Sequence, residues 1–127
     1  MRRTLVAIGV VLLAGAGQAY AHHSFAAEFD AARPVTLTGT IVIVEWVNPH
    51  SMLWIDVRGA GGRSERWGFE LSPPNALMRR GLRRAMLRAG DRITIRAYPA
   101  RDGRRFASVQ ALTLTNGRRV AMGRVSP

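Results

Sequence analysis

Apolar and polar side chains alternate along most of the chain between residues 35 and 122, in short segments that end at turn signals. A period of two places successive side chains on opposite faces, so each segment predicts a β-strand with one buried face. The turn signals include Asn48-Pro49, the glycine-rich loop 59–62, Asp102-Gly103 and Asn116-Gly117. The predicted strands are residues 35–47, 51–58, 64–71, 92–98, 106–115 and a short 118–122.

Two of these segments depart from simple alternation. In residues 35–47 one parity is apolar at first, and both parities are apolar later. This pattern predicts a long, strongly curved strand, with Gly39 as the site of a bulge or bend. Residues 106–115 have no clear parity, which we interpret as a second bulge.

A single helical segment is predicted between the third and fourth strands. Ser72 is the expected N-cap and Pro73 the expected first helical residue. An apolar stripe with a spacing near four continues the helix, although Gly81 weakens its middle and allows two short turns instead. The stripe consists of Leu77, Met78, Leu82 and Met86.

This order of elements predicts an all-β fold, an OB-like five-stranded barrel with one short helix between strands 3 and 4. A small β-sandwich with a helical connection is the alternative. A chain of 127 residues has room for one domain, here residues 35–122. The absence of cysteine excludes disulfide scaffolds, cysteine-ligated zinc, iron–sulfur clusters and cysteine nucleophiles.

Residues 1–21 have the plan of a secretory signal peptide. Arg2 and Arg3 precede an apolar run from Leu5 to Ala16, and Ala19-Tyr20-Ala21 supplies small residues at positions −3 and −1 of a cleavage site. Cleavage after Ala21 predicts a periplasmic or secreted protein with no transmembrane span. The alternatives are an uncleaved anchor or a buried helix, but the run is shorter than the about 20 residues that span a bilayer.

The mature chain then begins with an N-terminal arm, residues 22–34, and ends with a tail, residues 123–127. Phe25 and Phe29 lie four residues apart, which suits one helical turn packed against the core. Pro34 prevents the helix from continuing and favours extended chain before it.

The three histidines are candidate metal ligands. Cleavage after Ala21 makes His22 the N-terminal residue, whose α-amine and ring nitrogen can chelate one ion. His50, in the turn after the first strand, is the expected second histidine, and His23 is the other candidate. Nitrogen donors in a tetragonal arrangement suit copper, so copper is the metal expected if these residues bind one; the alternative is that the terminal histidines bind no metal. An oxygen could come from Glu28, Asp30 or Glu45.

Other interpretations of the histidines stay open. Cleavage one residue earlier would place His23 at position three, where amine, backbone nitrogens and imidazole also bind copper(II). His50 can equally serve to hold the turn by hydrogen bonding to backbone. Because the chain has no cysteine, any metal would be held by nitrogen and oxygen donors.

A ligand-binding surface is expected near the same turn and on strands 2 and 3, the usual binding face of an OB-like barrel. Trp46 and Asn48 lie in the turn itself. Trp54 shares a parity with Asp56 and should face outward beside Arg66, where aromatic and arginine side chains can stack on bases or sugars. Alternatively, Trp54 packs beneath the arm or the helix. Trp67 shares its parity with Phe69 and Leu71 and is predicted to be core.

All 19 basic residues are arginines, against 8 acidic residues, and the formal charge is +11. The helical segment carries a group of them at Arg79, Arg80, Arg83 and Arg84, with Arg88 beyond. Such a face suits an acidic partner or an anionic envelope polymer, or it is simply a solvated surface. Export argues against nucleic acid as a partner. No hydrolase, zinc-protease or phosphate-loop motif is present, so a binding role is favoured over an enzyme.

Several motifs together resemble a known family, that of small exported bacterial proteins catalogued as domain of unknown function 6152. The motifs are His22-His23-Ser24-Phe25, Glu45-Trp46-Val47-Asn48-Pro49-His50, Trp67-Gly68-Phe69-Glu70 and Ser72-Pro73-Pro74-Asn75-Ala76-Leu77. The resemblance implies an exported protein without an assigned role and supplies no catalytic residue. It places His22, His23 and His50 in the two most family-like motifs.

Overall fold

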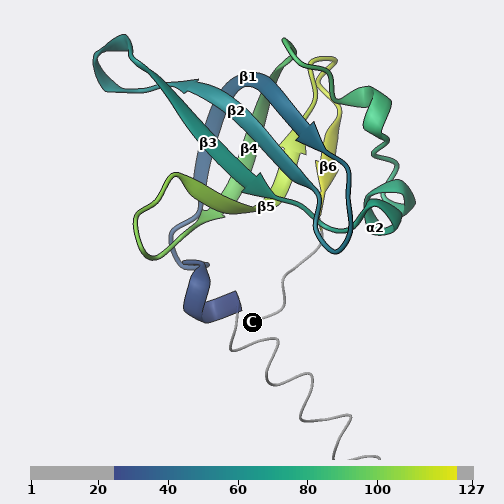
Figure 1. The fold of residues 1–127 in the computed structure, drawn as a ribbon, viewed down its shortest axis with the longest axis horizontal. Coiled ribbons are helices and arrows are strands. Elements are labelled where there is room, and N and C mark those ends of the chain that lie inside the picture. The colour runs from purple at the N-terminus through teal and green to yellow at the C-terminus, as the bar shows by residue number, and fades with distance from the viewer. Residues whose placement is uncertain (1–24, 123–127) are drawn as a thin grey trace, which may run out of the picture.

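The computed structural model describes residues 25–122, which form a small β-barrel with short helical connections (Figure 1). The barrel strands are β1 (Val35–Glu45), β2 (Met52–Arg58), β3 (Ser64–Glu70), β4 (Arg92–Pro99) and β5 (Phe106–Thr113). The remaining elements are η1 (Ala60–Gly62), α2 (Pro74–Arg79), η2 (Arg84–Met86) and β6 (Arg119–Ala121). No helix within this part of the chain is long and apolar enough to cross a membrane.

The five long strands close on themselves. β1 pairs antiparallel with both β2 and β4, β2 pairs with β3, and β4 pairs with β5. A parallel pairing of β3 with β5 completes the ring, and β6 extends β5 on its other side. The closing pairing joins Gly68–Glu70 of β3 to Phe106–Ser108 of β5, so the barrel is closed at the end of β3. The structure therefore confirms the predicted all-β, OB-like five-stranded barrel with a helix between strands 3 and 4.

The curvature of β1 was predicted correctly, but the bulge was placed at the wrong residue. The first half of β1 pairs with β4 and the second half with β2, and the register against β2 shifts between Ile41 and Ile43. Gly39 is instead a point of close approach, because a Cβ there would lie 2.5 Å from the Asp56 carbonyl oxygen. The bulge explains why Ile41 is buried and Ile43 is exposed.

The second predicted bulge is confirmed in β5. Arg96 pairs with Ala111 but Ala97 pairs with Val109, so Gln110 has no partner on β4. Ala111 and Leu112 are consecutive and both buried, as a bulge allows. This irregularity removes the simple parity from the sequence of the strand.

The helical segment differs from the prediction at its start. Ser72 is not the cap: α2 begins at Pro74, with Pro73 as its N-cap in an extended conformation (φ −56°, ψ 153°). The reason is that a residue before proline is driven out of the helical region, so Pro73 cannot itself be helical when Pro74 follows it.

The predicted division at Gly81 is confirmed. Gly81 takes a positive φ of 78°, and a separate turn, η2, follows it. The break changes the phase of the apolar stripe: Leu77, Leu82 and Leu87 are buried, whereas Met78 and Met86 are exposed. The prediction that both methionines belong to the buried stripe was therefore wrong.

The core lies inside the barrel and beneath α2 and η2. Its largest fully buried side chains include Phe69, Ile41, Leu53, Ile55 and Ile95. Trp67 packs against this core, partly buried, and its ring stacks on Phe69 at a centroid separation of 6.2 Å. The core thus fills the space between the strand faces that alternation predicted to be buried.

Candidate functional site

A pocket of about 430 Å³ lies where the N-terminal arm meets the barrel. The arm, the β1–β2 turn, the β3–α2 connection and β5 each supply part of its wall. The lining residues are Phe25, Glu28, Phe29, His50, Glu70, Leu71, Ser72, Pro73, Ser108, Val109 and Met122. One histidine and two carboxylates therefore share this cavity.

The β2–β3 hairpin brings His50 to Glu70. Its register pairs Met52 with Glu70, so the residues before β2 lie beside the residues after β3. The Leu71 amide donates to the Ser51 carbonyl oxygen at 2.9 Å, and Ser51 is itself buried. Because this backbone bond extends the hairpin past β2, the position of His50 relative to Glu70 is determined by the hairpin rather than by a free loop.

His50 and Glu70 are in direct contact through Nδ1 of the imidazole and Oε1 of the carboxylate. The His50 side chain is 56% exposed, whereas that of Glu70 is 20% exposed. A carboxylate on one ring nitrogen holds the orientation of the imidazole and leaves Nε2 as the nitrogen that can bind another group.

The electrostatics of the pocket act on Glu70 from several sides. Burial raises the pKa of Glu70, and the nearby carboxylate of Glu28 raises it further. The charges of His50 and Arg104 act in the opposite direction and lower this pKa. Glu70 is thus a carboxylate whose negative charge is costly in its surroundings and is favoured by a cation beside it.

Arg104 holds the second carboxylate of the pocket. Its Nη2 donates to Oε1 of Glu28 at 2.5 Å, and its Nε is 3.2 Å from the carboxylate of Asp102. The guanidinium also lies over the Phe106 ring, 4.8 Å from the centroid. These contacts anchor Glu28 to the β4–β5 hairpin.

The arm is docked on that hairpin by backbone and aromatic contacts. Residues 25–28 are helical, as the spacing of Phe25 and Phe29 predicted, and Phe29 forms a bridge to Ala100. The Asp30 amide donates to the Pro99 carbonyl oxygen, and the Arg101 amide donates to the Glu28 carbonyl oxygen, both at 2.9 Å. Phe25, the first residue that the structure describes, therefore lies at the pocket.

The predicted metal ligands fall in two groups. His50 lies in the pocket, while His22 and His23 lie outside the described residues. Among the three proposed oxygen donors, Glu28 lines the pocket. Glu45 instead accepts a bond from Trp54 Nε1 at 3.5 Å, and Asp30 accepts from Arg33 Nε at 2.9 Å. Within residues 25–122 no three histidine or acidic side chains lie close enough together to hold a metal.

The predicted ligand-binding residues do not gather at the pocket. Trp46 packs partly buried against the core, and Asn48 is exposed in the turn. Trp54 is partly buried on β2, and its ring lies over Gly68, where an added Cβ would be 2.6 Å from the indole. Arg66 is occupied by Asp56, to which it donates two hydrogen bonds of 2.8 and 3.0 Å.

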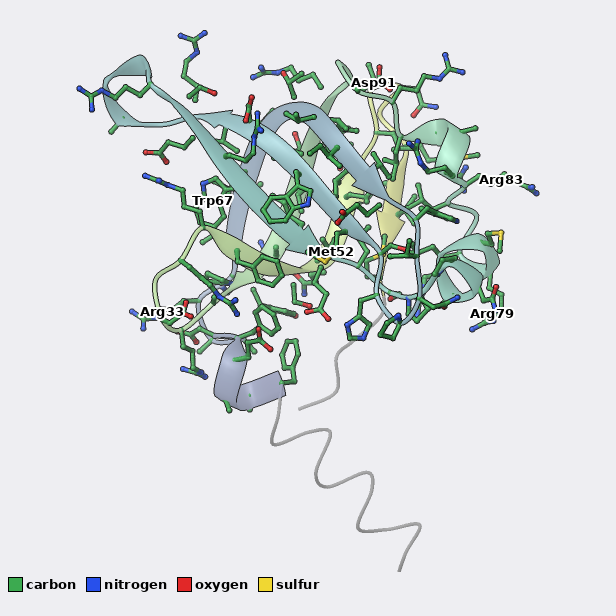
Figure 2. All side chains as sticks on the ribbon, viewed as in Figure 1. Arg33, Met52, Trp67, Arg79, Arg83 and Asp91 are labelled. Carbon is green, nitrogen blue, oxygen red and sulfur yellow. The ribbon has the colours of Figure 1, made fainter. Side chains whose placement is uncertain are left out.

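The arginine group lies on the α2–η2 segment. Gly81 separates Arg79 and Arg80 from Arg83 and Arg84, so they do not form one continuous helical face. In the described chain none of these four is within 4.0 Å of a carboxylate oxygen. Arg79 and Arg83 extend outward from the surface (Figure 2).

A model of a family of unknown function, DUF6152, matches residues 10–109 of the chain. The chain belongs to this family. The range that the family model matches includes His50, Glu70 and every other lining residue of the pocket except Met122. No curated protein and no solved structure matches the chain.

Sequence reasoning missed the pairing of His50 with Glu70. The signal that could have found it is the hairpin itself: the loop 59–62 lies midway between Met52 and Glu70. Folding the two strands about that loop places the residue two before Met52 next to the residues that follow β3. The contact between Glu28 and Arg104 has no such local signal, because 76 residues separate the two.

Proposed function

We propose that this family member is exported to the periplasm and binds a copper ion between its mature N-terminus and the pocket at His50. The observation that carries the proposal is the contact of His50 with Glu70 in a pocket that Phe25 also lines. His22 precedes Phe25 by three residues. An extended chain spans at most about 3.6 Å per residue, so the Cα of His22 lies within about 11 Å of the Cα of Phe25.

The donor set supports copper over other metals. A mature N-terminus at His22 offers an amine and an imidazole, and His50 offers Nε2, which gives three nitrogen donors. Copper(II) prefers nitrogen donors in a tetragonal arrangement and stands highest in the affinity order of the divalent metals. Magnesium and calcium prefer oxygen ligands, of which the pocket supplies only Glu28 and Glu70 as carboxylates.

Glu70 supports the proposal as an outer partner of the metal. Histidines that bind metals almost always donate their other ring N–H to a carboxylate or carbonyl, which orients the ring and raises its basicity. Glu70 stands in this relation to His50 through Nδ1. In the proposed site Nε2 of His50 would bind the metal, and the partly buried carboxylate of Glu70 would gain a nearby cation.

The test uses protein exported by its own leader, with the N-terminus verified by mass spectrometry. We expect the mature chain to begin at His22 and to bind one copper(II) ion in a calorimetric titration. Loss of an outer carboxylate typically weakens metal binding 10–100-fold. His50→Ala removes a proposed direct ligand, so it should weaken binding by more than roughly tenfold. An alanine inserted before His22 should have a comparable effect, because it moves the amine away from the imidazole.

His23→Ala is the matched control, since it removes an adjacent imidazole and leaves the proposed donors intact. Unchanged binding in His50→Ala would contradict the proposal. Loss of binding in His23→Ala with full binding in His50→Ala would indicate the alternative site, in which the chain begins at Ala21 and His23, as its third residue, supplies the imidazole. Thermal unfolding of each variant shows whether the barrel is intact.

A second candidate function is supported by the arginine group on α2 and η2. Arg79, Arg80, Arg83 and Arg84 are exposed and without a carboxylate partner in residues 25–122, which suits an acidic partner or an anionic envelope polymer. The exposed side chains of Met78 and Met86 add apolar surface beside them.

A further inference from the structure

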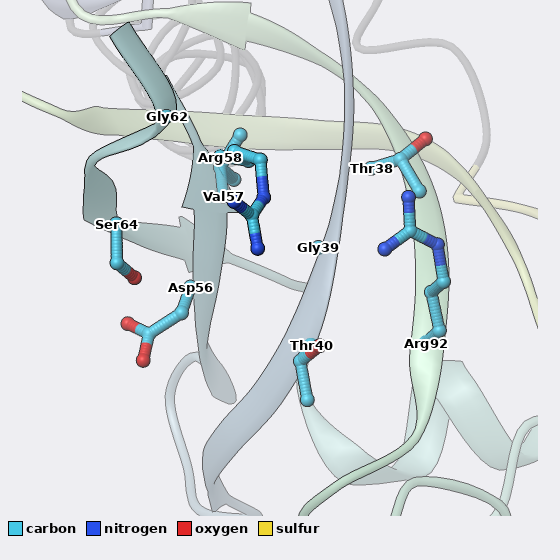
Figure 3. A pocket seen from close by; sticks show the side chains of 9 residues that line it. All are labelled: Thr38, Gly39, Thr40, Asp56, Val57, Arg58, Gly62, Ser64 and Arg92. Atoms are coloured by element: carbon cyan, nitrogen blue, oxygen red, sulfur yellow. The ribbon is translucent and has the colours of Figure 1, made fainter. Parts of the chain in front are cut away.

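A second pocket of about 230 Å³ lies on the outer surface of the barrel, across β1 (Figure 3). It shares no lining residue with the pocket at His50. The register explains its composition: Gly39 of β1 pairs with Val57 of β2, and Thr40 of β1 pairs with Arg92 of β4. Arg58, which follows Val57, and Arg92 therefore stand on the two strands that flank β1.

The charge of this pocket is positive and uncompensated. Neither Arg58 nor Arg92 has a carboxylate oxygen within 4.0 Å anywhere in residues 25–122. Asp56 is the acidic residue of the lining, and its carboxylate is bound by Arg66 through two hydrogen bonds. Figure 3 shows the guanidinium groups of Arg58 and Arg92 on either side of β1 at Gly39, with the Asp56 carboxylate directed away from them.

Hydroxyl groups complete the lining. Thr38 and Thr40 come from β1 and Ser64 from the start of β3. Thr38 is held in place through a 2.8 Å hydrogen bond between its Oγ1 and that of Thr94. Guanidinium groups and hydroxyls in one lining are donor types that bind the oxygens of a phosphate group.

We propose that this pocket binds a phosphate group, either as inorganic phosphate or as a phosphate monoester. Two arginines match the charge of about −2 that such a group carries near neutral pH. The volume argues against a large ligand, because sites for drug-sized molecules occupy about 300–1,000 Å³. The proposal is independent of the copper site, since it uses different residues on a different face.

The experiment is a titration of the purified protein with inorganic phosphate, followed by amide NMR spectra at constant ionic strength. We expect saturable shifts at Thr38, Thr40 and Ser64. The double variant Arg58→Gln, Arg92→Gln should weaken binding by about tenfold or more, because hydrogen bonds between charged groups are lost. The matched control Arg79→Gln, Arg83→Gln removes the same charge elsewhere and should leave the affinity within about twofold, as for separate sites.

A second arm identifies the source of the phosphate group. Vesicles of phosphatidylcholine with and without phosphatidic acid present the monoester on a lipid. Binding of free phosphate, or binding only to vesicles with phosphatidic acid, supports the proposal if it depends on Arg58 and Arg92. Equal weakening by the two double variants, or no binding in either arm, would overturn it, because attraction would then be diffuse or absent.

Discussion

Phe29 is the side chain that holds the N-terminal arm on the barrel. It is 2% exposed, and its ring lies 6.1 Å from that of Phe106 and 5.2 Å from that of Phe25. Burying a phenylalanine contributes about 1.5–3 kcal/mol, and an aromatic pair contributes about 0.5–1.5 kcal/mol more. We therefore expect Phe29→Ala to lower the free energy of unfolding by about 3 kcal/mol.

We expect the substitution to loosen the junction between the arm and the barrel before it unfolds the barrel itself. The Asp30 and Arg101 amides, which bond across the junction of arm and barrel, should exchange with solvent much faster in Phe29→Ala. Amides of the barrel strands should keep their order of protection. Copper binding should weaken as well, because the arm no longer starts from the rim of the pocket.

Urea denaturation measures the stability change, and amide exchange by NMR locates it. Phe25→Ala is the control for loss of an aromatic ring from the same helical turn, and it should cost less because Phe25 is only partly buried. A loss below about 1 kcal/mol in Phe29→Ala, the typical effect of an average substitution, would refute the reasoning. Unchanged exchange at Asp30 and Arg101 would refute it too.

Three other predictions follow from named contacts. Gly39→Ala places a Cβ 2.5 Å from the Asp56 carbonyl oxygen and should lower stability by about 1–3 kcal/mol in urea melts, whereas Thr36→Ala on the exposed side should change little. The hydrogen bond from Arg33 lowers the pKa of Asp30 in the folded protein. The ionised Asp30 should therefore add to the free energy of unfolding above the ordinary pKa of about 3.9, and this contribution should be lost as the pH falls below that value. Asp30→Asn should remove that part of the acid dependence in thermal melts, and an unchanged profile would show that Asp30 contributes nothing. Reversing Arg79, Arg80, Arg83 and Arg84 to Glu should abolish salt-sensitive binding to an anionic polymer such as heparin, and retention of that binding would reject the second candidate function.

The barrel could be predicted because alternation reports burial directly. Most strands were recognised from their period of two, although the bulge in β5 left residues 106–115 without a clear parity. The helix between the third and fourth strands then set the topology. The bulge in β1 could not be located, because Ile41, Val42 and Ile43 are all apolar and no residue type distinguishes the one that is displaced. The bulge was predicted at Gly39 because glycine often marks one, but Gly39 instead allows the backbone of β2 to approach closely.

Proline chemistry and long-range contacts account for the other differences. Pro73 was predicted to begin the helix, but Pro74 keeps the residue before it out of the helical region. His50 was recognised as a candidate ligand from its turn, and the hairpin register explains its partner Glu70. The role of Glu28 depends on the docking of the arm against Arg104, which no local pattern contains.

The most direct test of the copper site is paramagnetic broadening of amide signals by one equivalent of copper(II), in exported protein that begins at His22. The account predicts loss of the signals of pocket residues such as Leu71, Ser72, Ser108 and Val109, with those of Thr38, Ser64 and Arg92 retained. Broadening confined to the residues before Phe25, with the pocket signals intact, would contradict it.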